Sequence, residues 1–339
     1  MKKFSKVLAC VLAGAMAFSL AACGGSSSSS SSASASASAA ASAETSADAA
    51  DDTVYKIGVL QLTQHAALDA SNEGFFAALD DLGIKYEADQ QNAAGEQSTC
   101  QTIAEKFAND GKDLIFAIAT PAAQAVAGVI TDVPIVVTAV TDPAASGLVD
   151  SNDAPGGNVT GTSDLTPVKE QIELLQKILP DAKKVGILYC SAEANSILQA
   201  DMAKEACDAA GLEYADYTVS NSNEIQSVVE SMVGKVDAIY SPTDNMIAAG
   251  MSTVAMVAND NGIPTICGEE GMVDAGGLAT YGINYYELGY LAGQQAAEIL
   301  TGNADPATTP IGYLSADECT LAVNEETAAT LDIDISTLK

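Results

Sequence analysis

Polar side chains follow most of the predicted strands of this chain, where they could together bind a small molecule. Most of them are hydroxyls, amides or carboxylates, which recognise a ligand by hydrogen bonds and charge. Because open parallel sheets bind ligands beyond the carboxyl ends of their strands, we expect one site built from these groups. The groups are Gln61 to His65 (which includes Leu62), Thr120-Pro121, Thr141-Asp142, Ser191 with Asn195-Ser196, Thr243-Asp244-Asn245, and Glu269-Glu270.

Two successive runs of alternating strands and helices are predicted to position these groups. Short apolar runs indicate buried parallel strands, and apolar residues at helical spacing indicate the intervening helices. The first run has strands at 55–62, 84–88, 113–119 and 133–137, helices at 68–82, 95–109 and 122–130, and a loop at 147–159. The second has helices at 167–179, 193–210, 224–232 and 245–259 and strands at 184–189, 213–219, 238–240, 264–266 and 278–280. This alternation predicts an α/β protein of two doubly wound parallel-sheet lobes.

A further helix at 285–300 and a closing strand at 320–323 are most simply placed one on each lobe. The chain would then cross between lobes three times, near Gly161, Gly282 and Pro306, and form a hinge that can open and close. The predicted first lobe is 54–161 plus 282–306, and the predicted second lobe is 162–281 plus 307–339.

The N-terminus reads as an export signal. Lys2, Lys3 and Lys6 precede an apolar run from residue 7 to 20 that is too short for the roughly 20 residues of a membrane-spanning helix. Leu20-Ala21-Ala22-Cys23-Gly24 resembles the bacterial lipobox, so we expect residues 1–22 to be a signal peptide and Cys23 to be lipidated. The Ser- and Ala-rich stretch at 23–53 has too few large apolar groups to fold and is predicted to be a tether.

Composition limits the possible partners. The formal net charge is −31, which disfavours nucleic acid and anionic lipid surfaces. All 14 basic residues are lysines and there is no tryptophan, so a pocket has no guanidinium and only Tyr and Phe as large aromatic walls. The cysteines beyond Cys23 are widely spaced without a metal-binding pattern, and we expect them to be buried thiols. No metal or cofactor is predicted.

An extracellular α/β enzyme is the main alternative class. The chain has no G-x-S-x-G motif, no P-loop and no G-x-G-x-x-G after a strand, and a Ser-His-Asp triad would depend on His65, the one histidine. The adjacent acids Glu269-Glu270 and Asp80-Asp81 are more typical of a solvated surface than of paired catalytic carboxylates. We therefore expect a binding protein and no enzymatic activity.

Several long segments, in the same order, resemble a family of ABC-transporter substrate-binding proteins whose characterised members bind tryptophan and related aromatic amino acids. The resemblance extends from Tyr55 nearly to the end of the chain. It is carried by Ile57 to His65 with Ala67-Leu68-Asp69 and Glu73-Gly74-Phe75, by Ala119 to Ala122, Thr138 to Pro143, Asn158 to Asp164, Tyr240 to Asn245, and Gly282 to Gly289.

This resemblance implies a type I periplasmic-binding-protein-like fold and a monomeric, extracytoplasmic, lipid-anchored protein that delivers its ligand to an ABC permease in the membrane. The expected ligand is an aromatic L-amino acid such as tryptophan. A branched apolar amino acid or a nucleoside-like compound is the alternative, and a ligand sensor without transport is an alternative role.

The expected ligand assigns roles to some of the polar residues. Asp244, oriented by Asn245, is predicted to pair with the ligand ammonium, although Thr243-Asp244 could instead cap the helix that follows. With no arginine, the ligand carboxylate is expected at the start of the helix after Thr120-Pro121, near the hydroxyls of Thr120, Thr141 and Ser191.

Two aromatic positions are also candidates. His65 could stack on an aromatic ligand or donate a hydrogen bond, or it could be a surface residue. Tyr285 could form a wall of the pocket or be buried in the core by the helix that follows it.

Overall fold

The structure is a computed structural model that describes residues 53–315 and 319–338. The predicted signal peptide, Cys23 and all but the last residue of the predicted tether lie outside the described residues. Within the described ranges, no helix is long and apolar enough to cross a membrane.

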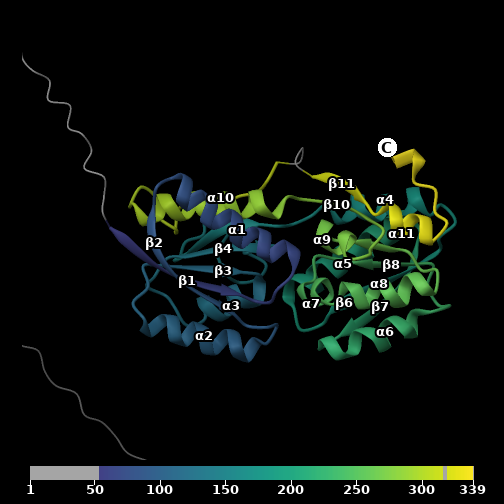
Figure 1. Ribbon diagram of the computed structural model, residues 1–339, viewed down its shortest axis with the longest axis horizontal. Helices are drawn as coiled ribbons and strands as arrows, with labels where there is room; N and C mark the ends of the chain where they lie inside the picture. The colour runs from purple at the N-terminus through teal and green to yellow at the C-terminus, as the bar shows by residue number, and fades with distance from the viewer. Residues whose placement is uncertain (1–52, 316–318, 339) are drawn as a thin grey trace, which may run out of the picture. The chain divides into compact units, whose positions relative to one another are not determined.

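Five parallel strands form the sheet of the first lobe, in the order β2-β1-β3-β4-β5. Helices α1 and α10 lie on one face of this sheet and α2 and α3 on the other (Figure 1). The elements are β1 (Val54–Gln61), α1 (Ala66–Asp81), β2 (Lys85–Asn92), α2 (Gln97–Asn109), β3 (Leu114–Ile118), α3 (Thr120–Ala127), β4 (Ile135–Val140), β5 (Val159–Ser163) and α10 (Tyr285–Leu300).

Six strands form the sheet of the second lobe, in the order β11-β10-β9-β8-β6-β7. All pairs are parallel except that of β10 and β11, which is antiparallel. The elements are α4 (Val168–Ile178), β6 (Lys184–Cys190), α5 (Ala194–Ala210), β7 (Glu213–Val219), α6 (Ile225–Met232), β8 (Ala238–Ser241), α7 (Asn245–Ala249), α8 (Met251–Asp260), β9 (Thr265–Cys267), α9 (Glu270–Asp274), β10 (Ala279–Gly282), β11 (Thr320–Val323) and α11 (Glu325–Thr330), with short 3-10 turns at Ser222–Glu224 and Ser336–Leu338.

Burial follows the sequence pattern in both sheets. Every residue of β3, an unbroken apolar run, is buried, as expected for a central parallel strand covered on both faces. Edge strand β2 is mostly exposed or half-buried. The core of the first lobe includes residues of α10, while the second lobe has one core under α4, α5 and α11 and another under α6, α8 and α9. The predicted architecture of two α/β lobes with parallel sheets is confirmed.

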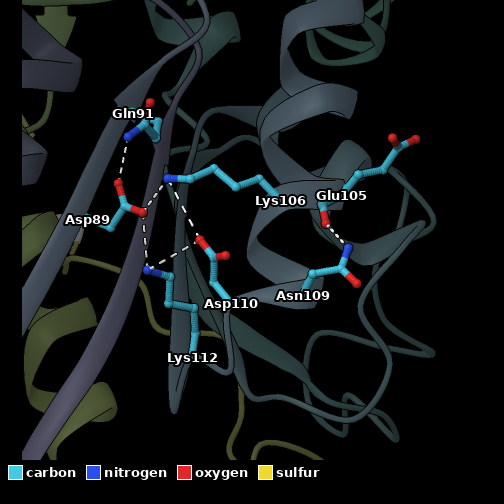
Figure 2. A network of polar contacts seen from close by, with 7 residues as sticks. All are labelled: Asp89, Gln91, Glu105, Lys106, Asn109, Asp110 and Lys112. Atoms are coloured by element: carbon cyan, nitrogen blue, oxygen red, sulfur yellow. Dashed lines mark hydrogen bonds and ion pairs between the residues drawn. The ribbon is translucent and has the colours of Figure 1, made fainter.

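Edge strand β2 is joined to the rest of its lobe by an ion-pair network (Figure 2). Lys106 of α2 and Lys112, just beyond α2, both contact Asp89 of β2, with Nζ to Oδ2 distances of 2.5 and 3.1 Å. The hydrogen bond from Lys106 is the main reason that the pKa of Asp89 falls to about 2. The network therefore holds Asp89 ionised and fixes an edge that has a sheet partner on one side only.

The chain passes between the lobes at positions that differ slightly from the predicted ones. Strand β5 continues in the first sheet to Ser163, two residues beyond the expected boundary at 161. After α10 the chain stays with the first lobe at least to Gly312, which pairs with Thr162 and donates its N–H to Gly161, whereas the expected boundary was 306.

Strand β5 was itself not predicted as a strand. Its sequence, Val-Thr-Gly-Thr-Ser, is polar and contains Gly161, which usually marks a loop. Gly161 has φ of +140°, and a Cβ there would lie 2.0 Å from the backbone oxygen of Val137 on β4. The close approach of two buried strands thus requires glycine at this position. The polar sequence can be fully buried because the hydroxyls of Thr160, Thr162 and Ser163 all donate hydrogen bonds within the protein.

The helix predicted at 245–259 is in fact two helices, α7 and α8, separated at Gly250. Gly250 is also a tight contact, because a Cβ there would lie 2.4 Å from Cδ1 of Ile225. The break lets α7 stay short beside the end of β8, where its first turn faces the other lobe.

Candidate functional site

A narrow cavity lies between the two lobes, at the carboxyl ends of their strands. Its lining residues come from the end of β4, from the loops after β1, β5, β8 and β9, and from helices α1, α7 and α10. The space between them is about 260 Å³, including the part that opens to solvent. The lining consists of His65, Leu68, Ala139, Asp164, Thr243, Asp244, Asn245, Ala248, Glu269 and Tyr285.

His65, the residue before α1, forms part of the first-lobe wall and bonds to the second lobe. Its Nε2 lies 3.4 Å from Oδ1 of Asn245. The Asn245 amide is oriented by its Nδ2, which donates to Oε2 of Glu193 at 2.6 Å, so Nε2 of His65 must be the donor. Burial lowers the pKa of His65 to about 4, so the ring is neutral and its buried, unpartnered Nδ1 is an acceptor.

The second-lobe wall is built by the start of α7. Asp244 caps this helix: Oδ1 accepts the Ile247 N–H at 2.8 Å and Oδ2 accepts the Cys190 N–H. Glu193 accepts the Met246 N–H as well as the Asn245 amide. The alternative in which Asp244 caps the helix is therefore realised, and the same residue also lines the cavity.

The hinge side of the cavity is formed by Asp164, Tyr285 and Glu269. The Tyr285 hydroxyl donates to Oδ2 of Asp164 at 2.7 Å, and the other oxygen of Asp164 is buried without a partner. Glu269 caps α9 by accepting the Gly271 N–H at 2.6 Å. Glu269 and Glu270 were expected to form a solvated pair, and this is wrong for Glu269, which is 3% exposed because its carboxylate turns inward to cap α9. Glu270 is exposed, as expected.

The cavity has a strongly acidic lining. Burial raises the pKa of Asp164 to about 6 and of Glu269 to about 7, and burial together with Asp244 raises the pKa of Glu193 to about 8. Burial also raises the pKa of Asp244, against the effect of its backbone N–H bonds. No lysine is among the described lining residues, so these acids share a site that a cation would stabilise.

Several other predicted residues lie beside the cavity and connect the lobes. Nε2 of Gln199 on α5 donates to the hydroxyl of Thr141 in the first lobe at 3.0 Å and to that of Thr243 in the second at 2.5 Å. Asn195 donates to the Thr243 backbone oxygen and to the hydroxyl of Ser196. These residues are all buried and support the cavity wall from behind.

The remaining predicted residues lie outside the cavity lining. Leu62 is part of the first-lobe core, and Asp142 accepts two backbone N–H groups within its own loop. Thr120 and Pro121 are buried at the start of α3, where the Thr120 hydroxyl has no partner. Ser191 is exposed and donates to the Val219 backbone oxygen.

The prediction missed two acidic residues of the site, Asp164 and Glu193, and three apolar ones, Leu68, Ala139 and Ala248. Asp164 closes one of the segments that carry the family resemblance, and Glu193 follows β6 as the other site groups follow their strands. The position of an acid after a buried strand was a signal available for both. Ala139 has a positive φ of 52°, which the sequence does not reveal.

A larger hollow of about 1510 Å³, again including the part open to solvent, lies elsewhere, on α4, and shares no lining residue with the interlobe cavity. It is open to solvent, and Lys169, Glu170 and Lys177 stand among apolar neighbours there. It lacks the convergence of buried polar groups from both lobes that marks the narrow cavity.

Metal binding and disulfide formation have little support in the described part of the chain. No group of three or more His, Cys, Asp or Glu side chains there could hold a metal ion. Five cysteines are free; Cys319 is half-buried, and the other four are buried as predicted (Cys100, Cys190, Cys207 and Cys267).

Two doubly wound lobes with an enclosed polar cavity at their junction define a two-lobed solute-binding protein of the type I periplasmic kind. A sequence model described as ABC transporter substrate binding protein matches residues 56–337. The chain belongs to this family of extracytoplasmic binding proteins.

Three relatives illustrate the similarity. A tyrosine-binding protein of Clostridioides difficile strain R20291 is 43% identical over 281 residues, which are 82% of this chain and 81% of that protein. The ABC domain from Streptococcus pneumonia in complex with L-Trp is 38% identical, with a TM-score of 0.81 over 84% of this chain and 98% of the other. A ligand-free, open substrate-binding protein with adhesive properties from Clostridium difficile is 43% identical, with a TM-score of 0.63 over 83% of this chain and 95% of the other.

Proposed function

We propose that this protein captures an aromatic L-amino acid, tyrosine or tryptophan, between its lobes and delivers it to an ABC importer. The observation that carries the proposal is the interlobe cavity, which combines four buried carboxyls at or beside its wall with the rings of His65 and Tyr285. Such a lining suits a ligand that has both an ammonium and an aromatic side chain. The tyrosine-binding relative and the relative with bound L-Trp support the same ligand class.

The two ends of the ligand would meet different parts of the site. The ammonium would lie among the carboxyls, and the aromatic ring would pack against His65, Leu68 and Tyr285. Thr120 lies outside the lining of the narrow cavity, but its hydroxyl is buried without a partner at the first residue of α3, and we retain it as the candidate for the ligand carboxylate. Ser191 is less suited, since it is exposed.

We further propose that the structure represents the closed form. Its TM-score is higher against the L-Trp complex than against the open structure, although the open structure has the higher sequence identity. The cavity is also narrow, because its lining residues leave only about 260 Å³ between them even when the part open to solvent is included. The lobes must therefore separate to admit an aromatic amino acid, and ligand binding would shift the population toward closure.

Anchoring at the membrane is part of the proposal. Cleavage before Cys23 and lipidation of its sulfur would tether the body on the outer face of the cytoplasmic membrane, close to its permease. The protein would act as a monomer without cofactor and without catalysis.

A thermal-shift screen of the full-length protein in detergent tests the proposed ligand class, because a ligand of the native state raises the melting temperature by mass action. The panel is the L-amino acids with representative nucleosides and sugars. Tyrosine, tryptophan or both should give the largest shift. A shift from a nucleoside or sugar alone would contradict the ligand class while leaving the family membership intact.

A further inference from the structure

Asp164 occupies a distinctive place in the cavity. It lies on the first crossing between the lobes, directly after β5, and is 4% exposed. Its partner Tyr285 begins α10, directly after the second crossing. The hydrogen bond between them therefore joins two of the three hinge segments at the cavity wall.

The carboxyls of the site differ in how fully the protein satisfies them. Both oxygens of Asp244 accept backbone N–H groups, and Glu193 receives the Asn245 amide and a backbone N–H. Among the described acids at the cavity, Asp164 alone has a buried carboxyl oxygen, Oδ1, with no donor in hydrogen-bond geometry, although the Thr141 hydroxyl is near enough to the carboxyl to lower its pKa.

We propose that Asp164, rather than Asp244, accepts the ligand ammonium on its free oxygen, with Tyr285 as the positioning residue that holds the other oxygen. The inference rests on the proposed function. A buried acceptor without a donor is unfavourable, and an ammonium supplies three donors and the opposite charge. Asp244 already has its donors and is mainly needed to start α7.

The surroundings of Asp164 add a pH signature. The groups near it are Glu269, the Tyr285 hydroxyl and the Thr141 hydroxyl, with the neutral His65 and Asp244 on the other walls of the cavity. Burial is the main cause that raises the pKa of Asp164 to about 6, so near neutral pH part of the ligand-free protein carries a proton there. Ammonium binding would release this proton.

The test compares two probes by titration calorimetry on the full-length protein: L-tyrosine, and 3-(4-hydroxyphenyl)propanoate, which lacks the ammonium. The Asp164→Asn substitution keeps the size and shape of the side chain, and the new amide oxygen can still accept the hydrogen bond from the Tyr285 hydroxyl. It should weaken L-tyrosine binding by roughly 100-fold and leave the deamino probe nearly unchanged. The matched control, Asp244→Asn, should weaken both probes alike, because it disturbs the α7 cap.

A second measurement uses the wild type and is independent of how the variants fold. Between pH 7 and pH 5 the affinity for L-tyrosine should fall with a slope approaching tenfold per pH unit below about pH 6, and that for the deamino probe should not. The Glu269→Gln variant should show the same dependence of L-tyrosine affinity on pH as the wild type, because protonation of Asp164 is what weakens binding.

The outcomes separate the two proposals. If the wild type binds neither L-tyrosine nor L-tryptophan, the proposed function fails and this inference with it. If the wild type binds L-tyrosine but Asp164→Asn retains the preference for the amine, or Asp244→Asn alone loses that preference, Asp164 is not the ammonium partner and only this inference is overturned.

Discussion

At the residue scale, the unusual feature is a group of buried acids with no lysine among the described residues that line the cavity. A buried charge without a partner is unfavourable, so in the ligand-free protein these groups respond by holding protons at higher pH than exposed acids do. Asp164 and Glu269 have pKa values of about 6 and 7, whereas unfolded chains have ordinary values near 4. When a cationic ligand group binds beside these carboxyls, it should favour their ionised form and so release protons from the site.

These shifts predict how the stability of the ligand-free protein depends on pH. Between the unfolded and folded pKa values the native state holds more protons than the unfolded state, so the free energy of unfolding falls as pH rises. From pH 5 to pH 7.5 the part of this decrease that comes from Asp164 and Glu269 should be on the order of 4 kcal/mol. Glu193, with a pKa of about 8, adds to the decrease, whereas His65, with a folded pKa of about 4, opposes it below about pH 6.5; Asp89, with a pKa of about 2, is ionised across this range in both states and adds no slope.

Urea denaturation at several pH values measures this dependence. Asp164→Asn combined with Glu269→Gln should make the decrease smaller by roughly 4 kcal/mol, because two of the raised groups are removed, while Glu193 and Asp244 keep part of the slope. A stability that increases from pH 5 to pH 7.5 would show that these carboxyls are not buried as uncompensated acids.

At the element scale, the pair α1 and α10 brings together segments more than 200 residues apart, through glycines. A Cβ at Gly289 would lie 1.9 Å from the backbone oxygen of Ser71, and one at Gly74 would lie 2.0 Å from that of Tyr286. The helices therefore touch backbone to backbone. This contact binds the returning helix α10, and with it Tyr285, to the first lobe.

Gly289→Ala should accordingly destabilise the protein, by roughly 1–3 kcal/mol, since the helices must move apart or distort. Gly157→Ala is the matched control, because nothing lies within 4 Å of the position of its Cβ and its φ is not positive. The control should stay within about 0.5 kcal/mol of the wild type in urea denaturation. Equal stability of the two variants would contradict the close packing of α1 on α10.

The elements also show what the sequence could and could not predict. Unbroken apolar runs such as β3 were identified directly, because a central parallel strand is apolar on both faces. Strand β5 was missed because its burial depends on Gly161 fitting against Val137, a contact between strands that local composition does not encode. Similarly, His65 and Asp244 could be placed near the site from their positions after strands, but the inward turn of Glu269 and the unpartnered oxygen of Asp164 depend on tertiary packing.

At the scale of the whole molecule, polar contacts join the described parts of the two lobes across the cavity. They include the bonds of His65 to Asn245, of Gln199 to Thr141, and of Gln97 to the Ala192 backbone oxygen. Individual hydrogen bonds of this kind contribute only about 1 kcal/mol each. A ligand that contacts both walls can therefore determine whether the lobes are open or closed, which is what capture and release require.

The most direct test of this account is a calorimetric titration of the full-length protein in detergent with L-tyrosine and with L-tryptophan at pH 7.5. We expect saturable binding of at least one of them, with one molecule per chain and a dissociation constant on the order of micromolar or tighter. The absence of saturable binding of both amino acids, by a protein shown to be folded, would contradict the claim that the interlobe cavity captures an aromatic amino acid.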